Sequence, residues 1–263
     1  MPHLDPDRLR REQYASADNL NARRALHERF STNPYGWQRW VFDRLLRLAP
    51  ADVLEIGCGP GALWQDNLDR LPPSWRVTLS DFSAGMVGTA RRALPSGPFR
   101  YAVLDAARLA LADSTFDCAV ANHMLYHVAD RPAALREVAR ILRPGGVLLA
   151  ATNGADHLVE LNNLGRRHGF DMEMLDSAPF LLQNGESQLR QVFPQVDCER
   201  YEDSLRVTEG ETLVAYIRSV GGRMPDASAI EGLRAEVEER IQRDGLVTIR
   251  KEVGLFIART PNR

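Results

Sequence analysis

Three glycines alternate at the end of an apolar run in residues 53–64, which read VLEIGCGPGALW. Gly57, Gly59 and Gly61 follow a segment typical of a buried strand, and a helical segment follows them. Glycine tolerates backbone angles that other residues avoid, and it lets a ligand approach the main chain closely. The stretch therefore predicts a strand, a turn and a helix whose turn binds a cofactor; a tight turn without a ligand is the simpler alternative.

Two classes of cofactor fit a turn of this kind. Gly57, Gly59 and Ala62 satisfy the G-x-G-x-x-G/A pattern of nicotinamide- and flavin-binding domains. A pyrophosphate needs main-chain N–H donors, however, and Pro60 removes one of them within the turn. Glu55 also places an acid just before the glycines. A ligand without a pyrophosphate is therefore favoured, and the nicotinamide class stays open as the alternative.

Acids recur at the ends of the next two predicted strands. Asp81 ends the segment WRVTLSD, 20 residues after Gly61, and Asp105 ends the segment FRYAVLD. An acid in the first of these positions can hold both hydroxyls of a ribose. Three consecutive strands that each end near an acid favour a nucleoside that carries a cationic tail.

Strand and helix patterns alternate through the middle of the chain, which predicts βαβ units and a parallel sheet over residues 50–153. Pro144-Gly145-Gly146 is expected to end the last helix of this series. The predicted strands are 52–57, 75–81, 99–105, 116–123 and 145–153, and the predicted helices between them are 61–70, 83–94 and 131–143.

The flanking segments have a different pattern, without this alternation. Residues 196–207 alternate like an antiparallel strand, and residues 246–260 read as one long strand or as a strand with a bend at Gly254. Gly221–Ser228 is the best candidate for a linker or lid. Helices are predicted within 6–30 and at 37–48, 156–170, 186–193, 209–220 and 226–243, with a loop at 177–187.

Composition excludes several classes of protein. The 263 residues have a net charge of −2, which argues against a general binder of nucleic acid or of anionic membranes. The N-terminus lacks a hydrophobic signal region, and the three cysteines form no CxxC pair, so we expect a cytoplasmic protein without a zinc site. Lys251 is the only lysine, which removes the residue that a GxxxxGK[ST] phosphate loop requires.

The order of these motifs resembles a known family. E-x-G-x-G-x-G at 55–61, Asp81, the LDA at 104–106, FDCAVANHMLYHV at 116–128 and LREVARILRPGG at 135–146 are together similar to class I S-adenosylmethionine-dependent methyltransferases. Within that family the chain resembles the ubiquinone/menaquinone-methyltransferase-like group that acts on small molecules. The resemblance implies a fold of the α/β class, a Rossmann-like three-layer sandwich with a mostly parallel seven-stranded sheet, an antiparallel C-terminal strand and a helical cap.

The same resemblance implies a set of residues that bind S-adenosyl-L-methionine. The glycines would pass beneath the methionine part, Asp81 would bind the ribose, and Asp105 would accept from the adenine amino group. Simpler structural roles are open for some of them, because Met86 has the spacing of a core residue and an Asp before a turn often caps a helix. The implied residues are Glu55, Gly57, Gly59, Gly61, Asp81, Phe82, Met86, Asp105, Ala106 and Asn122.

Catalytic candidates lie in the segment NHMLYHV. His123 and His127 are the natural general bases, since a histidine titrates near neutral pH. Tyr126 replaces the first histidine of the LHH stretch to which the family assigns this role. A structural role for His127 and catalysis by positioning alone are the alternatives, and we expect positioning to be the larger contribution.

The acceptor pocket is expected to come from outside the parallel core. An Asn-Pro-Pro-Tyr-like motif is absent from the sequence, which argues against methylation of a nucleic-acid base. Tyr14 is favoured for closing over the cofactor and Glu160 for binding an amine or hydroxyl acceptor. The candidate residues are Tyr14, Arg23, Tyr35, Trp37, His157, Glu160, Phe170 and Met172.

The sequence thus predicts methyl transfer to an oxygen or nitrogen atom of a small molecule, such as a secondary metabolite. The alternatives are a peptide or protein acceptor, a nicotinamide-dependent oxidoreductase and a cofactor-binding module without catalysis. The expected organisation is a helical cap at 1–49, a cofactor-binding core at 50–153, and a region at 154–263 that adds a substrate cap and completes the sheet.

Overall fold

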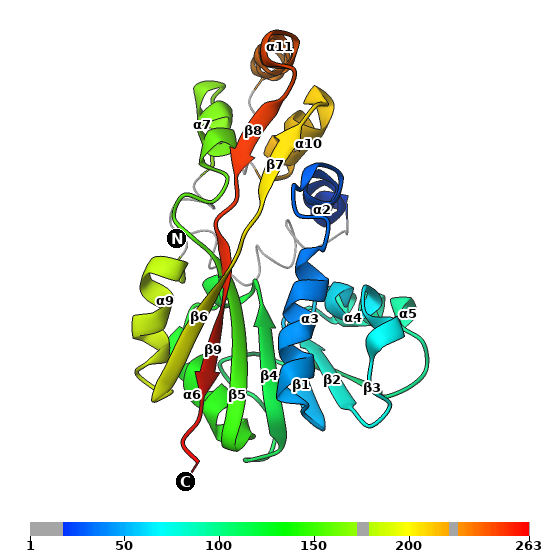
Figure 1. The fold of residues 1–263 in the computed structure, drawn as a ribbon, viewed down its shortest axis with the longest axis vertical. Coiled ribbons are helices and arrows are strands. Elements are labelled where there is room, and N and C mark those ends of the chain that lie inside the picture. Colours follow the sequence, from blue (N-terminus) through cyan, green and yellow to red (C-terminus); the bar gives the residue numbers. More distant parts are fainter. Residues whose placement is uncertain (1–17, 173–178, 221–225, 263) are drawn as a thin grey trace.

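A seven-stranded sheet forms the lower part of the computed structural model, which describes residues 18–172, 179–220 and 226–262 (Figure 1). The strand order is β3-β2-β1-β4-β5-β9-β6, and β9 runs antiparallel to both of its neighbours. This confirms the predicted sandwich with one antiparallel C-terminal strand. The strands are β1 (Asp52–Ile56), β2 (Arg76–Asp81), β3 (Phe99–Val103), β4 (Phe116–Asn122), β5 (Leu142–Asn153), β6 (Gln195–Tyr201) and β9 (Val253–Arg259).

Helices cover both faces of this sheet. Two hydrophobic clusters, one on each face, join the sheet to its helices and make the three layers. The helix patterns with the clearest apolar periodicity are confirmed closely, because α3 spans the predicted 37–48 and α6 begins at the predicted residue 131. One face carries α3 (Trp37–Leu48), α4 (Ala62–Gln65), the short helix η3 (Leu68–Arg70) and α5 (Ala84–Ala93), and the other carries α6 (Arg131–Ile141) and α9 (Leu182–Leu189).

Two expectations for local structure are wrong. Pro144, Gly145 and Gly146 lie inside β5 rather than before it, because the pairing of β4 with β5 shifts between Phe116 and Cys118 and the strand absorbs the extra residues as an irregularity. Helix α9 occupies much of the predicted loop at 177–187. Its first turn is held by the side chain of Asn184, which accepts from the N–H of Leu181.

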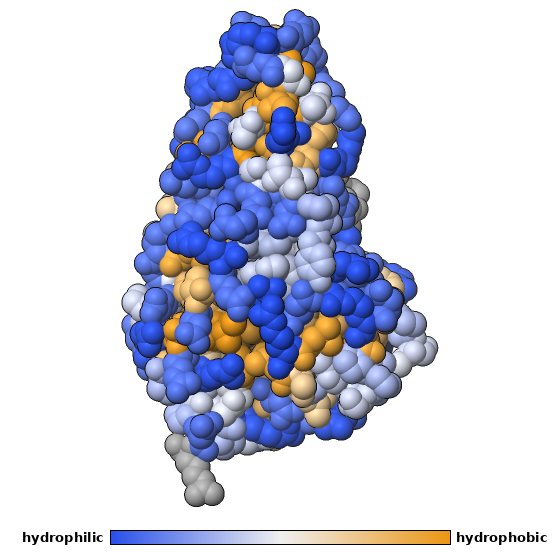
Figure 2. Space-filling model, in the orientation of Figure 1, coloured by the Kyte–Doolittle hydropathy of each residue, from blue (hydrophilic) through white to orange (hydrophobic). Residues whose placement is uncertain are grey.

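A second lobe stands on top of the sheet in Figure 1. It has its own hydrophobic core, to which Leu26, Leu205 and Ile249 belong. Figure 2 shows apolar surface over this lobe and again over the sheet, with a polar and neutral band between them. The lobe consists of α2 (Asp18–Phe30), α7 (Val159–Arg167), α10 (Gly210–Val220), α11 (Ala227–Asp244) and a two-stranded sheet of β7 (Ser204–Val207) and β8 (Val247–Arg250).

Two short segments between strands connect the lobe to the sheet, and we call them breaks in the strand pattern. Glu202 and Asp203 separate β6 from β7, and Lys251 and Glu252 separate β8 from β9. The predicted bend at Gly254 is therefore wrong by a few residues. Lys251 forms a buried ion pair with Asp203, which also accepts from the hydroxyl of Ser31 after α2. The ion pair fixes both breaks at the junction of the two lobes.

Candidate active site

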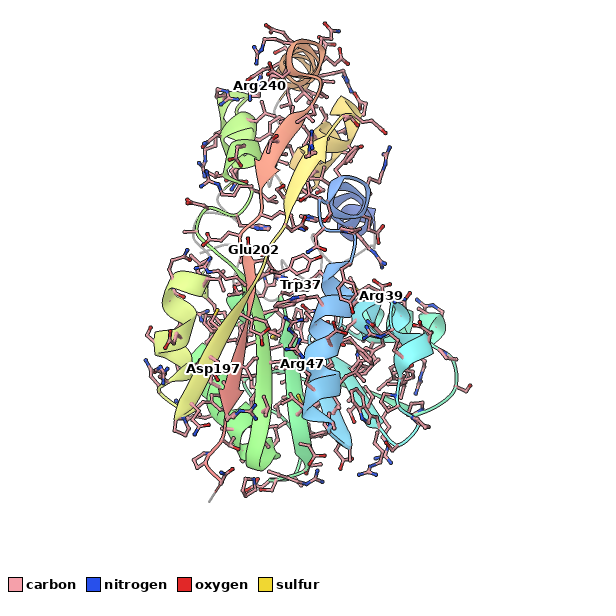
Figure 3. The ribbon with its side chains drawn as sticks, viewed as in Figure 1. Trp37, Arg39, Arg47, Asp197, Glu202 and Arg240 are labelled. Atoms are coloured by element: carbon pink, nitrogen blue, oxygen red, sulfur yellow. The ribbon has the colours of Figure 1, made fainter. Side chains whose placement is uncertain are left out.

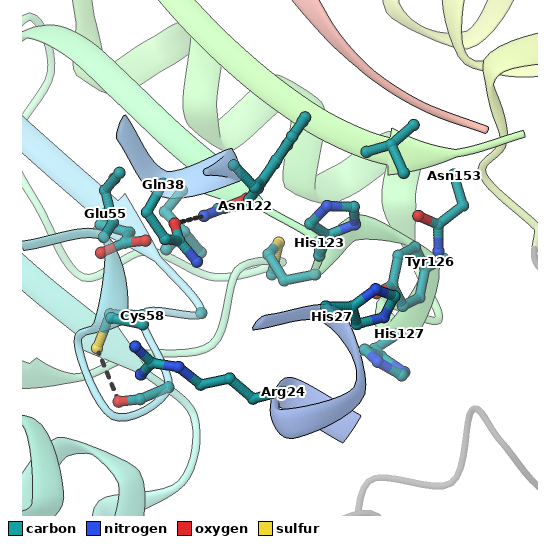
Figure 4. Close-up of a pocket in the computed structure, with 18 of the residues that line it drawn as sticks. Arg24, His27, Gln38, Glu55, Cys58, Asn122, His123, Tyr126, His127 and Asn153 are labelled. Atoms are coloured by element: carbon teal, nitrogen blue, oxygen red, sulfur yellow. Dashed lines mark hydrogen bonds between the residues drawn. The ribbon is translucent and has the colours of Figure 1, made fainter. Parts of the chain in front are cut away.

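A cavity of about 1120 Å³ lies between the carboxyl ends of the parallel strands and the second lobe. The predicted histidines line it, and so does the predicted cofactor set except for Gly61. Figure 4 shows Glu55 and Cys58 on one side, and His27, His123, Tyr126 and His127 gathered on the other. We call these the cofactor side and the acceptor side.

The three glycines of the loop have three different surroundings, although each has a positive φ, of 68°, 54° and 83° in order along the chain. A Cβ at Gly57 would lie 2.7 Å from Cβ of Met124, so this glycine permits close approach of the segment after β4. A Cβ at Gly61 would lie 3.2 Å from Leu94. A Cβ at Gly59 would meet nothing within 4 Å, because this glycine faces the cavity. Only Gly59 is therefore free of packing demands and open to a ligand.

Glu55 is buried beneath the glycine loop, with 2% of its surface exposed. Its carboxyl group accepts from Nε1 of Trp64 at 2.6 Å. Burial raises the pKa of Glu55 to about 8; the Trp64 hydrogen bond opposes this and the charge of Asp81 adds to it. The loop therefore rests on an acid that holds its proton at neutral pH.

Asp81 ends β2 beside the same loop. One carboxylate oxygen accepts from the N–H of Gly59 at 3.0 Å, and the other accepts from Ser83 at 2.8 Å. The hydroxyl of Ser83 caps α5 by accepting from Met86, so Asp81 is not the helix cap. Burial raises its pKa, against these main-chain hydrogen bonds. With the N–H of Phe82, three main-chain donors use three of the four lone pairs of this carboxylate, which leaves one for a hydroxyl from the cavity.

The remaining residues of the predicted cofactor set also line the cavity, but the structure gives two of them a structural role as well. Met86 is 6% exposed, so it is a core residue that also reaches the cavity. Asp105 is exposed and its carboxylate accepts from the N–H of Ala107 at 2.9 Å, which stabilises the turn after β3. Phe82 and Ala106 lie with them along the wall.

Asn122 joins the end of β4 to the start of α3. Its side-chain oxygen accepts from Nε1 of Trp37 at 3.0 Å, and its amide group donates to Gln38 at 3.0 Å. Figure 3 shows Trp37 at the end of α3 that faces the second lobe. This network links the two sides of the cavity.

His123 follows directly and has a positive φ of 58°. Its ring centroid lies 5.1 Å from that of Trp37. Burial, with a smaller effect of the Lys251 charge, lowers the pKa of His123 to about 4. The expected titration near neutral pH is therefore not a property of His123, which is a neutral imidazole at physiological pH. His127 lines the same side and its ring lies 4.5 Å from that of Tyr126.

The predicted acceptor residues divide into two groups. Tyr35, Trp37 and His157 line the cavity, with Tyr35 at its exposed rim. Phe170 and Met172 belong to the core of the second lobe instead, because their side chains are buried there. Tyr14 lies outside the described residues, and the side chain of Arg23 outside the described side chains.

Glu160 does not line the described cavity, and the preference for it as an acceptor ligand finds no support. Its carboxylate accepts from the N–H of Arg250 at 2.9 Å and thereby connects α7 to β8. This is a structural role within the second lobe.

Sequence reasoning missed several residues that the second lobe contributes to the cavity. His27 lies on α2, Tyr201 ends β6, and Lys251 and Asp203 lie at the junction. Arg24 on α2 also lines the cavity and forms an ion pair with Asp66, at 3.2 Å, across to the end of α4. The one signal in the sequence was Lys251, a single lysine among 33 basic residues.

Within residues 18–172, 179–220 and 226–262, no cluster of three or more histidines, cysteines and acids has the arrangement of a metal site. None of the described helices combines the length and apolarity that a membrane span demands.

Comparison with known proteins places residues 54–150 in a family described as "Methyltransferase domain". Over 117 residues the chain is 35% identical to the ubiquinone/menaquinone biosynthesis C-methyltransferase UbiE of Hahella chejuensis. This alignment covers 43% of this chain and 47% of that protein. It is 36% identical over 136 residues to a malonyl-[acyl-carrier protein] O-methyltransferase of Enterobacter lignolyticus, covering 49% of this chain and 51% of that one. The chain thus spans about half the length of the curated relatives it matches.

The fold is shared with solved structures at lower identity. Phosphoethanolamine N-methyltransferase 2 of Haemonchus contortus, solved in complex with S-adenosyl-L-methionine, superimposes with a TM-score of 0.59 at 20% identity, over 97% of this chain and 59% of that one. Residues 54–150 therefore match a methyltransferase domain in sequence, and the whole chain shares its fold with a solved methyltransferase.

Proposed function

We propose that the chain transfers a methyl group from S-adenosylmethionine to an oxygen or nitrogen atom of a small molecule. The observation that carries this proposal is a single cavity with two chemically different sides. Buried acids and a glycine loop occupy one side, and aromatic and imidazole rings occupy the other. A cationic nucleoside fits the first, and an acceptor of modest size fits the second.

The residues of the cofactor side fit S-adenosylmethionine better than a dinucleotide. Its sulfonium and ammonium groups are cations, which the carboxylate of Asp81 favours, while Glu55 is protonated and neutral. A pyrophosphate would carry negative charge to Asp81. It would also compete with Asp81 for the N–H of Gly59, and Pro60 has no N–H to offer. A nicotinamide cofactor is therefore the weaker candidate.

The chemistry needs little more than position and exclusion of water. Bound S-adenosylmethionine supplies a methyl group on a positively charged sulfur, and the acceptor's lone pair forms the new bond as the carbon–sulfur bond breaks and leaves its electrons on sulfur. Trp37 and Asn122 connect the wall of the acceptor side to the end of β4, so they hold that wall in place. Orientation of this kind can supply much of the rate.

His123 is the better candidate for a general base, because it follows Asn122 and is neutral at physiological pH. A pKa of about 4 makes it a weak base, so its contribution is smaller than that of positioning. We expect the turnover rate to be flat between about pH 6 and pH 7, below the ionisation of Glu55 at about 8, except where the acceptor itself ionises. His127 is the second candidate.

A small acceptor is favoured over a peptide because the cavity lies between the two lobes rather than on one face. Its volume of about 1120 Å³ slightly exceeds the range of about 300–1,000 Å³ usual for small-molecule sites, as a cofactor and an acceptor together require. A binding module without catalysis is the remaining alternative.

Turnover with labelled cofactor tests the proposal. The chain is incubated with methyl-labelled S-adenosylmethionine and a panel of phenols, carboxylic acids, amines and short peptides, and labelled products are measured by mass spectrometry. We expect transfer to at least one small molecule, and its loss in Asp81→Ala. Cofactor binding without transfer to any member would support the binding module, and transfer to peptides alone would contradict the small-molecule acceptor.

A further inference from the structure

Two histidines from the second lobe, His27 and His157, form a ring pair at the acceptor side. Their ring centroids lie 6.3 Å apart at an interplanar angle of 23°, and the edge of Tyr216 packs 6.1 Å from His27. His27 comes from α2, and His157 from the turn before α7. Both line the cavity, and neither belongs to the methyltransferase-domain segment 54–150.

The hydrogen bonds of this pair define what it can offer a ligand. Nδ1 of His157 accepts from the N–H of Glu252 at 3.2 Å, so in the neutral ring the proton is on Nε2 and this atom is a donor. Nδ1 of His27 is buried without a hydrogen-bond partner among the described residues, and it is too enclosed to contact a ligand in the cavity. What the pair offers a ligand is therefore the Nε2 donor of His157, with the second ring beside it.

The charges around the pair disfavour a cation. Burial is the main cause that keeps the pKa of His27 at about 3, where the charge of Lys251 adds to it and that of Asp203 opposes it; burial also keeps the pKa of His157 well below its usual value. The acids that line this side of the cavity are already engaged: Lys251 and Ser31 bind Asp203, Arg24 forms an ion pair with Glu28, and Asp130 caps α6. A protonated amine would find no free carboxylate here, and burying its charge would cost free energy.

We propose that His27 and His157 form a subsite for an acidic oxygen of the methyl acceptor, a phenol or a carboxylic acid, and that they select it over an amine. The inference rests on the proposed function and narrows its acceptor. Two imidazoles supply donors and acceptors that match a hydroxyl or carboxyl group.

The rival reading is recognition of a cation by aromatic rings, since Trp37 and Tyr201 lie at the same side with ring centroids 5.4 Å apart. The two readings predict opposite preferences. Three probes of one shape separate them: 2-naphthoic acid, 2-naphthol and 2-naphthylmethylamine.

Binding of each probe to the full chain is measured by calorimetry in the presence of saturating S-adenosylhomocysteine. We expect the acid or the naphthol to bind at least about 10-fold more tightly than the amine, as a hydrogen bond to a charged group implies. His27→Phe keeps the ring and removes its nitrogens. His157→Asn keeps an acceptor for the N–H of Glu252 and removes Nε2.

Each variant should weaken binding of the favoured oxygen probe about 10-fold and leave binding of the amine and of S-adenosylhomocysteine within about twofold. His168→Gln is the matched control, because this histidine also belongs to the second lobe but pairs with Glu236 away from the cavity. Melting temperatures identify a variant that fails to fold. If one of His27→Phe and His157→Asn does not fold, the probe affinities of the other test the subsite.

The outcomes distinguish this inference from the proposed function. Failure of S-adenosylhomocysteine to bind the unmodified chain would contradict the proposed function itself. Normal binding of S-adenosylhomocysteine would overturn the subsite alone if the amine bound as tightly as the oxygen probes, or if no oxygen probe bound at millimolar concentration. Unchanged oxygen-probe affinity in a folded His27→Phe or His157→Asn would overturn it as well.

Discussion

The two sides of the cavity are assembled from very different lengths of chain. The cofactor side comes largely from consecutive βα units, with Glu55, Asp81 and Asp105 at the ends of neighbouring strands. The acceptor side joins His27, near one end of the chain, to Lys251, near the other. The first depends on local geometry within one sheet, whereas the second exists only when the second lobe docks on that sheet. Variants on the two sides should therefore fail in different ways.

The largest expected effect is on the stability of the acceptor side. Lys251→Ala leaves the carboxylate of Asp203 fully buried without its ion partner. Loss of one partner of a buried pair costs about 3–5 kcal/mol in the free energy of unfolding. Urea denaturation measures this cost, and Lys251→Met with Asp203→Asn should recover part of it. A loss below about 1 kcal/mol, the value typical of an exposed pair, would show that the junction does not depend on this pair.

The next effect concerns the cofactor side. Gly57→Ala places a Cβ 2.7 Å from Cβ of Met124 at a φ of 68°. Main chain and side chain must shift, so we expect affinity for S-adenosylhomocysteine to fall by at least about 100-fold, or about 2.7 kcal/mol. Calorimetry measures it. Gly169→Ala is the control, because its φ is 75° but nothing lies within 4 Å, and cofactor affinity should not change there.

Lowering the pH should change the free energy of unfolding in opposite directions on the two sides. The pKa values of His27 and His123 are lowered to about 3 and about 4, so the unfolded chain takes up their protons below about pH 6.5 and stability is lost as the pH falls. The pKa of Glu55 is raised to about 8, so its contribution is lost as the pH rises from about 4.5.

The pKa of His157 is lowered as well, so three histidines act against one glutamate in the dependence of stability on pH. Below pH 6.5 the chain should therefore lose about 1–2 kcal/mol of unfolding free energy per pH unit. Urea titrations between pH 5 and 8 measure the slope, and His27→Phe should reduce it. If the unmodified protein and His27→Phe each had the same free energy of unfolding at pH 5 as at pH 6.5, these rings would ionise freely in the folded protein.

The smallest effect concerns the link between the two sides. Trp37→Phe keeps the aromatic ring and removes the Nε1 donor to Asn122, which costs about 1 kcal/mol of stability. We expect turnover to fall about 10-fold at saturating cofactor while cofactor affinity stays within about twofold, because the acceptor wall loses its attachment. Equal losses in turnover and in cofactor affinity would place Trp37 on the cofactor side instead.

The sheet and the cofactor side could be predicted because their signals are local. Apolar runs, glycines and strand-end acids recur within a few residues of one another, and Asp81 and Glu55 lie where their positions in the pattern indicate. The second lobe could not be predicted in the same way. His27 and Tyr201 are ordinary residues within their own segments, and only long-range packing brings them to one cavity.

Errors at the junction have a physical cause. The strand pattern of 246–260 continues through the break at Lys251, since side chains alternate on both sides of it, so the residue with the greatest backbone freedom, Gly254, was the natural choice for the bend. The sequence assigns the strand-end acids to the cofactor, which leaves Glu160 to face the acceptor, but a main-chain N–H of β8 uses its carboxylate.

Direct titration of the chain with S-adenosylhomocysteine and with NADH tests the central claim most directly. That claim is that the glycine loop and its acids hold the nucleoside of S-adenosylmethionine and not a dinucleotide. We expect calorimetry to show binding of S-adenosylhomocysteine and no binding of NADH. In Asp81→Ala the free energy of S-adenosylhomocysteine binding should fall by about 1–3 kcal/mol, the scale of a charge-assisted pair of hydrogen bonds. Binding of NADH without binding of S-adenosylhomocysteine would contradict the account.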